Sequence, residues 1–243
     1  MRSPARKTKR MGFIVPSINV IAEDDFIAMS PPDVGVHFAR ADVDRGRPLQ
    51  EQFQQMVDAA PSLAASLAKA GVGVCAFACT SASFFKGVGF DQTIAQAMRA
   101  ASGIECMTTS TAVLEALQAV GAHRIGLVTP YVRWVVEAER QFFTQSGIEV
   151  VAANGLERHG GSDINTIDDE TIRAQALAVA LPSSDAVFIS CTDLPSLALV
   201  ESLEQLTRRP VITSNQATFW ACARQLGIGP ISKFGRLLSG CLS

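Results

Sequence analysis

Short apolar runs alternate with stretches of helical periodicity along almost the whole chain. Eight runs are typical of buried strands: residues 12–15, 34–39, 73–78, 105–107, 125–128, 149–152, 186–190 and 210–213. Between them, apolar residues recur at helical spacing, most clearly at Leu49, Phe53, Met56, Val57, Ala60, Leu63, Ala64 and Leu67. Asp168 is predicted to cap the helix that runs to Leu181. The alternation predicts an α/β fold, with parallel sheets and helices on both of their faces.

The chain nearly repeats itself. Residues 12–16 (GFIVP) match residues 126–130 (GLVTP), Cys79-Thr80 matches Cys191-Thr192, and residues 104–121 match residues 210–227. Three matches in the same order predict two pseudo-symmetric α/β halves, residues 11–121 and 122–227. We expect residues 228–243 to pack back on the first half. Residues 1–10, of which five are basic, are predicted to form a disordered tail.

Composition excludes several classes of partner. The 243 residues are 48% hydrophobic and 18% charged, which indicates a well-filled core. The net charge of −2 offers no basic face for nucleic acid, and the apolar runs are too short to span a bilayer. We therefore expect neither nucleic acid nor a membrane as partner, while a homo-oligomer is left open. Six cysteines without a secretory signal predict free thiols in the cytoplasm.

Metal and nucleotide sites are not indicated. His37, His123 and His159 are scattered without metal-ligand spacing, and Cys75 and Cys79 lie too far apart for a CxxC pair. Neither GxGxxG nor GxxxxGK occurs, so no phosphate-binding glycine loop is predicted. We expect a protein that works without a metal or an organic cofactor.

Cys79 follows a predicted buried strand and precedes a turn of small polar residues. The backbone N–H groups and hydroxyls of Thr80 and Ser81 are expected to bind an anion at the start of a helix. The same positive helix end is predicted to lower the pKa of the Cys79 thiol. Cys191 with Thr192 follows another predicted strand in the same way.

The repeat places Cys79 and Cys191 at equivalent strand ends. Ligands of open parallel sheets bind beyond the carboxyl ends of the strands, so two facing halves would put the thiols on opposite sides of one cleft. Two such thiols can move a proton between the faces of a substrate, or add to a double bond, while nearby donors hold an enediolate. Buried cysteines more often only fill space, and this is our interpretation of Cys75, Cys106, Cys222 and Cys241.

Several single residues allow two interpretations. Asn215 stands at a strand end, where it could face the cleft or cap a helix, and Ser17 could donate to substrate or merely cap. Asp193 could orient a catalytic group, although an Asp that forms a turn is commoner.

These residues resemble motifs of the aspartate/glutamate racemase superfamily, in the branch of maleate cis-trans isomerase and arylmalonate decarboxylase. Residues 12–19 (GFIVPSIN) are similar to the N-terminal isomerase motif, which implies that Asn19 binds a substrate carboxylate. Residues 128–131 (VTPY) are similar to the strand-end motif of the family, which implicates Tyr131. Residues 189–191 followed by 194–197 (LPSL) also fit the isomerases.

Other segments resemble the decarboxylase instead. Residues 80–85 (TSASFF) and 109–114 (TSTAVL) are similar to it, and its Thr-Ser pair forms a dioxyanion hole. The decarboxylase, however, has glycine where this chain has Cys79. The chain thus combines a two-cysteine site with an anion pocket of the decarboxylase type, and Asn165 is the candidate counterpart of an isomerase loop asparagine.

Three functions from different classes follow. The leading hypothesis is a two-cysteine isomerase or racemase of a small carboxylic or dicarboxylic acid, most like maleate isomerase, with Cys79 and Cys191 as catalytic residues. The alternatives are a decarboxylase of the arylmalonate type, in which Cys191 alone donates the proton, and a non-catalytic protein that binds a small molecule.

Overall fold

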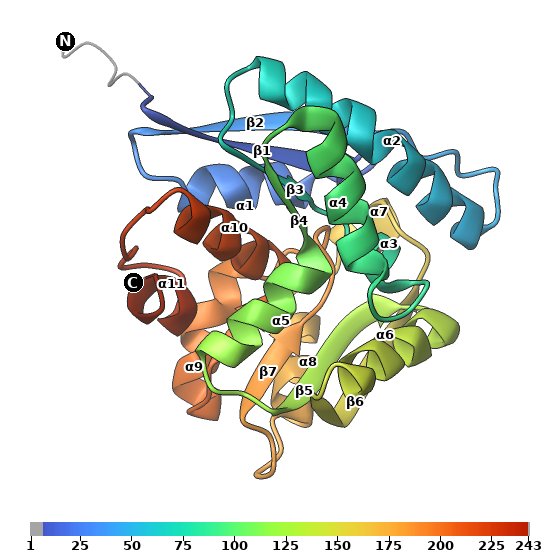
Figure 1. Cartoon of the computed structure of the whole chain (residues 1–243). Coiled ribbons are helices and arrows are strands. Elements are labelled where there is room, and N and C mark those ends of the chain that lie inside the picture. Colours follow the sequence, from blue (N-terminus) through green and yellow to red (C-terminus); the bar gives the residue numbers. More distant parts are fainter. Residues whose placement is uncertain (1–6, 243) are drawn as a thin grey trace.

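Eight strands form two parallel sheets of four strands each in the computed structural model, which describes residues 7–242 (Figure 1). The first sheet has the order β2-β1-β3-β4, with bounds Val34–Ala41, Lys9–Pro16, Val74–Phe77 and Glu105–Thr108. The second has the order β6-β5-β7-β8, with bounds Glu149–Arg158, Arg124–Tyr131, Ala186–Ile189 and Val211–Thr213. Each predicted strand is present, and the predicted α/β fold with two parallel-sheet halves is confirmed.

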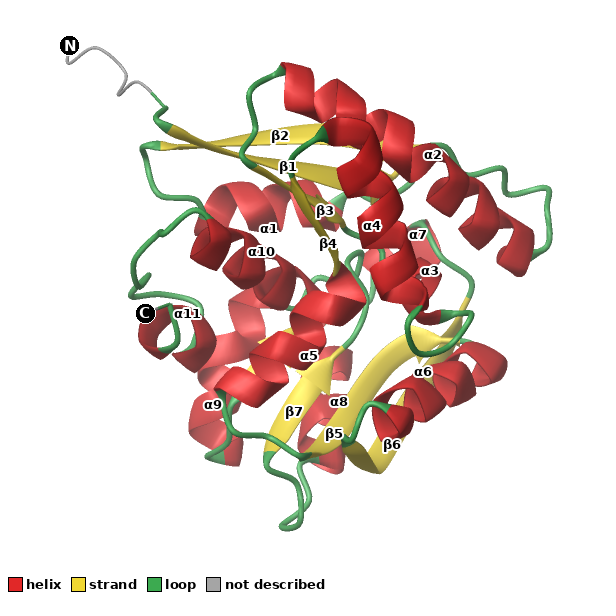
Figure 2. Cartoon of the chain, viewed as in Figure 1, coloured by secondary structure: helices red, strands yellow, loops and turns green. Residues whose placement is uncertain are grey.

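Helices lie on both faces of the sheets (Figure 2). Those of the first half are α1 (Ile21–Met29), α2 (Leu49–Lys69), α3 (Thr80–Phe84), α4 (Phe90–Ser102) and α5 (Thr109–Ala119). The later ones are α6 (Arg133–Gln145), α7 (Ser162–Asn165), α8 (Asp169–Val179), a 3-10 turn at Leu197–Leu199, α9 (Val200–Thr207), α10 (Ser214–Gln225) and α11 (Arg236–Gly240). Asp168 caps α8 as predicted, because its side chain accepts the N–H of Thr171 at 2.7 Å.

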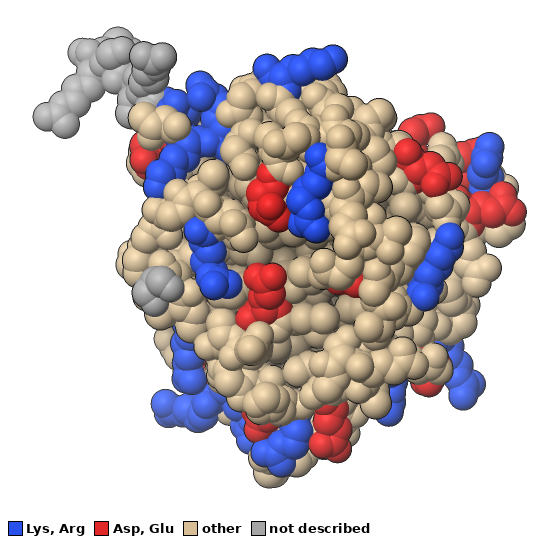
Figure 3. Space-filling view, in the orientation of Figure 1, with Lys and Arg blue, Asp and Glu red and all other residues tan. Residues whose placement is uncertain are grey.

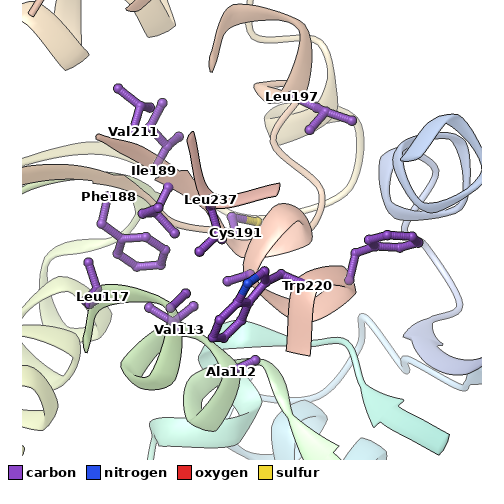
Figure 4. Close-up of a cluster of buried hydrophobic side chains, with 14 of the residues drawn as sticks. Ala112, Val113, Leu117, Phe188, Ile189, Cys191, Leu197, Val211, Trp220 and Leu237 are labelled. Carbon is purple, nitrogen blue, oxygen red and sulfur yellow. The ribbon is translucent and has the colours of Figure 1, made fainter. Parts of the chain in front are cut away.

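The two halves share one hydrophobic core. Helix α10 packs against α1 and β3 of the first half, and α5 packs against α10 and β8 of the second. In Figure 4, side chains of α5 such as Val113 and Leu117 lie beside Phe188 of β7 and Trp220 of α10. A second cluster fills the space between the first sheet, α2 and α4. The predicted boundary between residues 121 and 122 therefore separates the two sheets, but the larger core cluster crosses it.

Both predicted chain ends differ in detail from the structure. Strand β1 already begins at Lys9, and the N–H of Thr8 donates to the carbonyl of Asp33 at 2.9 Å, so part of the predicted tail of residues 1–10 is ordered. Residues 1–6 of that tail lie outside the described residues. The C-terminal segment contacts mainly the second half. Its Arg236 N–H donates to the carboxylate of the buried Glu204 of α9, and the carbonyl of Cys241 accepts the indole N–H of Trp220.

The surface carries charges of both signs. On the face shown in Figure 3, Lys and Arg side chains occur together with Asp and Glu side chains. Within residues 7–242, none of the helices combines the length and the apolar character that crossing a membrane requires.

Candidate active site

A cavity of about 90 Å³ lies where the carboxyl ends of β1, β3, β5 and β7 meet. Seven of the nine residues predicted for the site line it: Asn19, Cys79, Thr80, Ser81, Tyr131, Cys191 and Thr192. They come from both halves of the chain. The repeat thus brings the two cysteines to one cavity.

Cys79 ends the loop after β3 and precedes the first residue of α3, with an extended backbone (φ −144°). Burial raises the pKa of its thiol to about 11, although the N–H of Ala82 and the hydroxyl of Ser81 act in the opposite direction. We predicted a lowered thiol pKa at this helix end. The prediction is wrong because α3 has only five residues and because the loss of hydration outweighs its donors.

Cys191 has a different backbone conformation. Its φ of +97° is rare for a residue with a side chain and stores strain. Its Sγ accepts the N–H of Asp193 at 3.4 Å, and the hydroxyl of Tyr131 also stabilises the thiolate. Burial, followed by the negative charge of Asp193, nevertheless raises the pKa of this thiol far above its usual value. Both thiols line the same cavity, and a charge on Cys79 would raise the pKa of Cys191 further.

One hydroxyl connects the two cysteine loops. The Thr80 hydroxyl donates to Ser214 Oγ at 2.9 Å, and the backbone N–H of Cys191 donates to the same oxygen at 3.0 Å. Ser214 is the first residue of α10, which packs across both halves. The hydroxyl of Thr80 is therefore engaged. The N–H groups of Thr80 and Ser81 are the first two of α3, and a helix supplies no acceptor for them.

Asn19 and Thr192 form a second connection between the halves. The Asn19 side chain donates to Thr192 Oγ1 at 3.0 Å, and Thr192 Oγ1 donates to the carbonyl of Ala78 at 3.2 Å. The oxygen of Asn19 accepts the N–H groups of Ile21 and Ala22 at the start of α1. Asn19 is thus fixed in orientation, with its amide beside the cavity.

Tyr131 lies at the end of β5, opposite the first sheet. Its side chain is only 7% exposed, and burial raises the pKa of its phenol well above the usual value. The ring meets Phe84 of α3 edge-on, with ring centroids 6.5 Å apart. The hydroxyl therefore remains protonated and can donate to a ligand or to Cys191.

Two predicted site residues are not among the residues that line the cavity. Ser17 Oγ instead accepts the N–H of Val43 at 3.1 Å and so holds the loop after β2. The Asn215 amide donates to Asp25 at 2.7 Å and to the carbonyl of Thr192 at 3.0 Å. The predicted direct contacts with substrate are thus replaced by support for the loops. Asn165 acts similarly, since it donates to Asp193 at 3.3 Å.

Sequence reasoning missed much of the cavity wall. Apolar side chains come from α2, α6 and the segment around α7, and polar ones stand beside them: Leu49, Phe53, Met56, Val132, Val135, Ile164, Gln52, Arg158 and His159. The helical periodicity of α2 predicted Phe53 and Met56 as core residues. An apolar residue that lines a cavity follows the same spacing, so the sequence pattern does not distinguish the two. Ser214 was missed by one position, because only its neighbour Asn215 was selected.

The site has the means for acid–base or nucleophilic chemistry. Two thiols and one phenol face the cavity, together with backbone and amide donors. In residues 7–242, no group of three or more His, Cys, Asp and Glu side chains is placed to hold a metal ion. An anion can be held at the start of α3 while the two thiols act on the atoms beside it.

Comparison with known proteins identifies relatives along the full length of the chain. The family model of arylmalonate decarboxylase matches residues 11–238. The chain is 30% identical to the arylmalonate decarboxylase of Bordetella bronchiseptica over 237 residues, which cover 95% of this chain and 96% of that protein. It is 29% identical to the maleate isomerase of Nocardia farcinica over 241 residues, which cover 95% of each.

Solved structures point the same way. A cysteine-to-alanine variant of the maleate isomerase of Pseudomonas putida S16, solved with maleate, matches with a TM-score of 0.90 at 26% identity over 96% of this chain and 98% of that one. A cysteine-to-serine variant of the Nocardia farcinica maleate cis-trans isomerase matches with a TM-score of 0.88 at 26% identity, over 95% and 98% of the two chains. That variant carries a covalently bound succinylcysteine intermediate.

Proposed function

The chain belongs to the arylmalonate decarboxylase family, and from this membership we propose that it is a cofactor-independent isomerase or racemase of a small carboxylic acid. The predicted resemblance to the branch of maleate isomerase and arylmalonate decarboxylase is confirmed. One observation carries the proposal. Cys79 and Cys191 come from equivalent strand ends of the two halves and line the same cavity.

The two thiols divide the work. Burial raises the pKa of both thiols, but the charge of Asp193 is the second largest cause at Cys191 and only the smallest at Cys79, so Cys79 has the lower pKa and ionises first. Its thiolate removes the proton beside a carboxylate, or adds to one carbon of a double bond. Cys191 remains a thiol and donates a proton from the other side. In the isomerisation of an alkene, the Cys79 sulfur bonds to one carbon and the proton from Cys191 goes to the neighbouring carbon. After rotation about the bond between these two carbons, the Cys191 thiolate takes that proton back and the Cys79 thiolate leaves, which restores the double bond.

One part of the cavity, here called the carboxylate pole, would bind the substrate carboxylate and contains hydrogen-bond donors whose positions are fixed. The N–H groups of Thr80 and Ser81 stand at the start of α3, and the Asn19 amide and the Tyr131 hydroxyl lie beside the same cavity. Donors that are held in place before the reaction stabilise the enediolate without reorganisation. We assign Asn19, Thr80, Ser81 and Tyr131 to this pole as donors, and Thr192 as the residue that holds the Asn19 amide in place.

Decarboxylation of a malonate-type acid is the second candidate function. The apolar wall formed by Phe53, Met56 and Val135 favours it, because such a wall suits an apolar substituent next to the carboxylate donors. In that reaction, loss of carbon dioxide itself yields the enediolate. Cys191 alone then needs to donate a proton, and Cys79 is a bystander.

Incubation in deuterated water, followed by NMR, tests the proposal. Three classes of acid are offered in the presence of EDTA: cis-unsaturated diacids, chiral acids with one hydrogen beside the carboxyl, and disubstituted malonates. We expect cis–trans conversion or deuterium exchange with loss of optical activity, and none of either in a Cys79→Ala, Cys191→Ala double variant. Turnover of malonates alone would establish the second candidate. Absence of turnover in all three classes would contradict both.

A further inference from the structure

A carboxyl group lies buried behind the second cysteine loop, and the proposed reaction does not use it. Glu139 is in α6 and is fully buried, on the face that also buries Val135, Phe142 and Phe143. A carboxyl in apolar surroundings is costly unless it is hydrogen-bonded or paired with a cation. No cation is among the groups that influence its pKa.

The contacts of Glu139 fit a protonated carboxyl. Ser190 Oγ donates to Glu139 Oε1 at 2.5 Å, and the Thr129 hydroxyl adjoins the group as well. Oε2 and Thr129 Oγ1 are both buried and make no hydrogen bond of regular geometry within the described residues. A proton on Oε2 could be shared with Thr129 after a small rotation. An ionised carboxylate would instead remain poorly solvated.

Ser190 connects this carboxyl to the reacting thiol. It directly precedes Cys191, whose backbone is strained at a φ of +97°. Such a conformation persists only where the surroundings over-determine it. Three hydrogen bonds hold the backbone of Cys191 in this conformation. The Ser190 hydroxyl donates to Glu139, the N–H of Cys191 donates to Ser214 Oγ, and the N–H of Asp193 donates to the Cys191 sulfur.

We propose that Glu139 is a positioning residue, which in its protonated form holds Ser190 and thereby aims the thiol of Cys191 into the cavity. When Glu139 ionises, it places a negative charge behind the site and suppresses the reaction. The inference rests on the proposed function for its catalytic consequence, but the buried proton and the alignment of Cys191 can be measured without turnover.

The charges around Glu139 determine the direction of the effect. Helix α6 packs against β5, β6 and α3. The titratable group at the end of β5 is Tyr131. A charge on Glu139 raises the pKa of the Tyr131 phenol, and the Tyr131 hydroxyl donates toward Cys191. The charged residues of β6, namely Glu149, Glu157 and Arg158, are exposed, and α3 contains only Thr, Ser, Ala and Phe. An ionised Glu139 is therefore unpaired and disfavours both a thiolate and an enediolate nearby.

A pH profile of activity gives the first test. Burial raises the pKa of Glu139 to about 8 and that of Cys79 to about 11, so more Cys79 thiolate forms as pH rises, but above about pH 8 the charge on Glu139 should keep wild-type kcat from rising with it. Glu139→Gln keeps the shape and the acceptor for Ser190 but cannot ionise. We expect this variant to work at neutral pH with an unchanged KM, and its kcat to keep rising through pH 8, where that of wild type does not. The exposed Glu137→Gln on the same helix is the matched control and should keep the wild-type profile.

Removing the acceptor gives the second test. Glu139→Met should lower kcat by about 10- to 100-fold with little change in KM, because the thiol is misaimed and substrate binding is not affected. Ser190→Ala should have a similar effect, and the double variant should be no worse than either single one. Additive losses, or a Gln variant as inactive as the Met variant, would overturn the positioning role.

Two readouts do not depend on turnover. Between pH 4.5, the ordinary carboxyl value, and about 8, the folded chain keeps a proton that the unfolded chain has lost, so stability from Glu139 falls as pH rises. The Tm of wild type relative to Glu139→Gln should therefore decline over this range, and a constant difference would overturn the buried proton. Alkylation of Cys191, but not of Cys79, should change in Glu139→Met. If the substitution changes the rates of both cysteines equally, or changes neither, the alignment is overturned. If wild type has no activity but both readouts are as expected, only the proposed function is contradicted.

Discussion

The two cysteine loops occupy equivalent places in the repeat but differ in backbone and in charge. Cys79 is extended (φ −144°) and leads directly into α3, whereas Cys191 is left-handed (φ +97°) and leads into a turn before a 3-10 segment. Helix α3 offers its cysteine the N–H of Ala82 and the hydroxyl of Ser81. The second loop has no α-helix at this point. Equivalent positions in a repeat therefore bring two thiols together without giving them the same properties.

The residue two positions after each cysteine shows the difference most clearly. The offset of 112 residues that relates Cys79 to Cys191 also relates Ser81 to Asp193. The Ser81 hydroxyl lowers the pKa of Cys79, while the charge of Asp193 raises that of Cys191. Cys79 is therefore suited to act as the thiolate and Cys191 as the proton donor. We therefore expect the repeat to bring the two thiols together and the Ser81-to-Asp193 difference to separate their pKa values.

Removing each thiol separately is the strongest test of this division. For an isomerase or racemase, Cys79→Ala and Cys191→Ala should each lower kcat by about 10²- to 10⁴-fold, the usual range for loss of a general acid or base. One group cannot readily serve both faces of a planar enediolate. Turnover is measured on isomerisable acids and on disubstituted malonates. If Cys79→Ala remains near wild type while Cys191→Ala is inactive, the two loops do not share the reaction and the decarboxylase function replaces the isomerase.

Tyr131→Phe tests whether the phenol belongs to the Cys191 side of the site. The substitution removes one buried hydroxyl and keeps the ring that packs against Phe84. We expect kcat/KM to fall about a hundredfold, which corresponds to ~3 kcal/mol for a donor to the transition state. Trp134→Phe, at a partly exposed position on α6, is a control that should change little. An unaltered kcat/KM in Tyr131→Phe would remove this hydroxyl from the mechanism.

The alternating pattern was sufficient to predict the sheets. All eight strands were placed correctly, because short apolar runs between amphipathic helices admit few other folds. The crossing of α5 and α10 between the halves was not foreseen. A helix that is apolar on one face does not reveal which sheet it covers, and α10 is buried along almost its whole length.

Site residues were predictable where the repeat or a motif marked a strand end. This placed Cys79, Cys191, Thr80 and Thr192 at the cavity. Side-chain direction was not predictable, so Asn215 was expected in the cavity although its amide faces Asp25, and Ser214 was overlooked. Burial was also hidden from the sequence. The helix end at Cys79 indicated a low thiol pKa, and only the structure shows how completely the sulfur is dehydrated.

The smallest expected effect comes from altering the charge that distinguishes the loops. Asp193→Asn preserves the shape of the side chain and the acceptor for the N–H groups of Val20 and Ile21. The charge of Asp193 is the second largest cause of the raised pKa of Cys191, but the weakest of the causes at Cys79. Removing this charge should therefore lower the pKa of Cys191 more than the pKa of Cys79. The rate of alkylation of Cys191 relative to Cys79, followed by peptide mass spectrometry at alkaline pH, should rise between about two- and tenfold. In wild type, Cys79 should react first. An unchanged ratio in the variant would mean that backbone geometry, and not the Ser81-to-Asp193 difference, separates the two thiols.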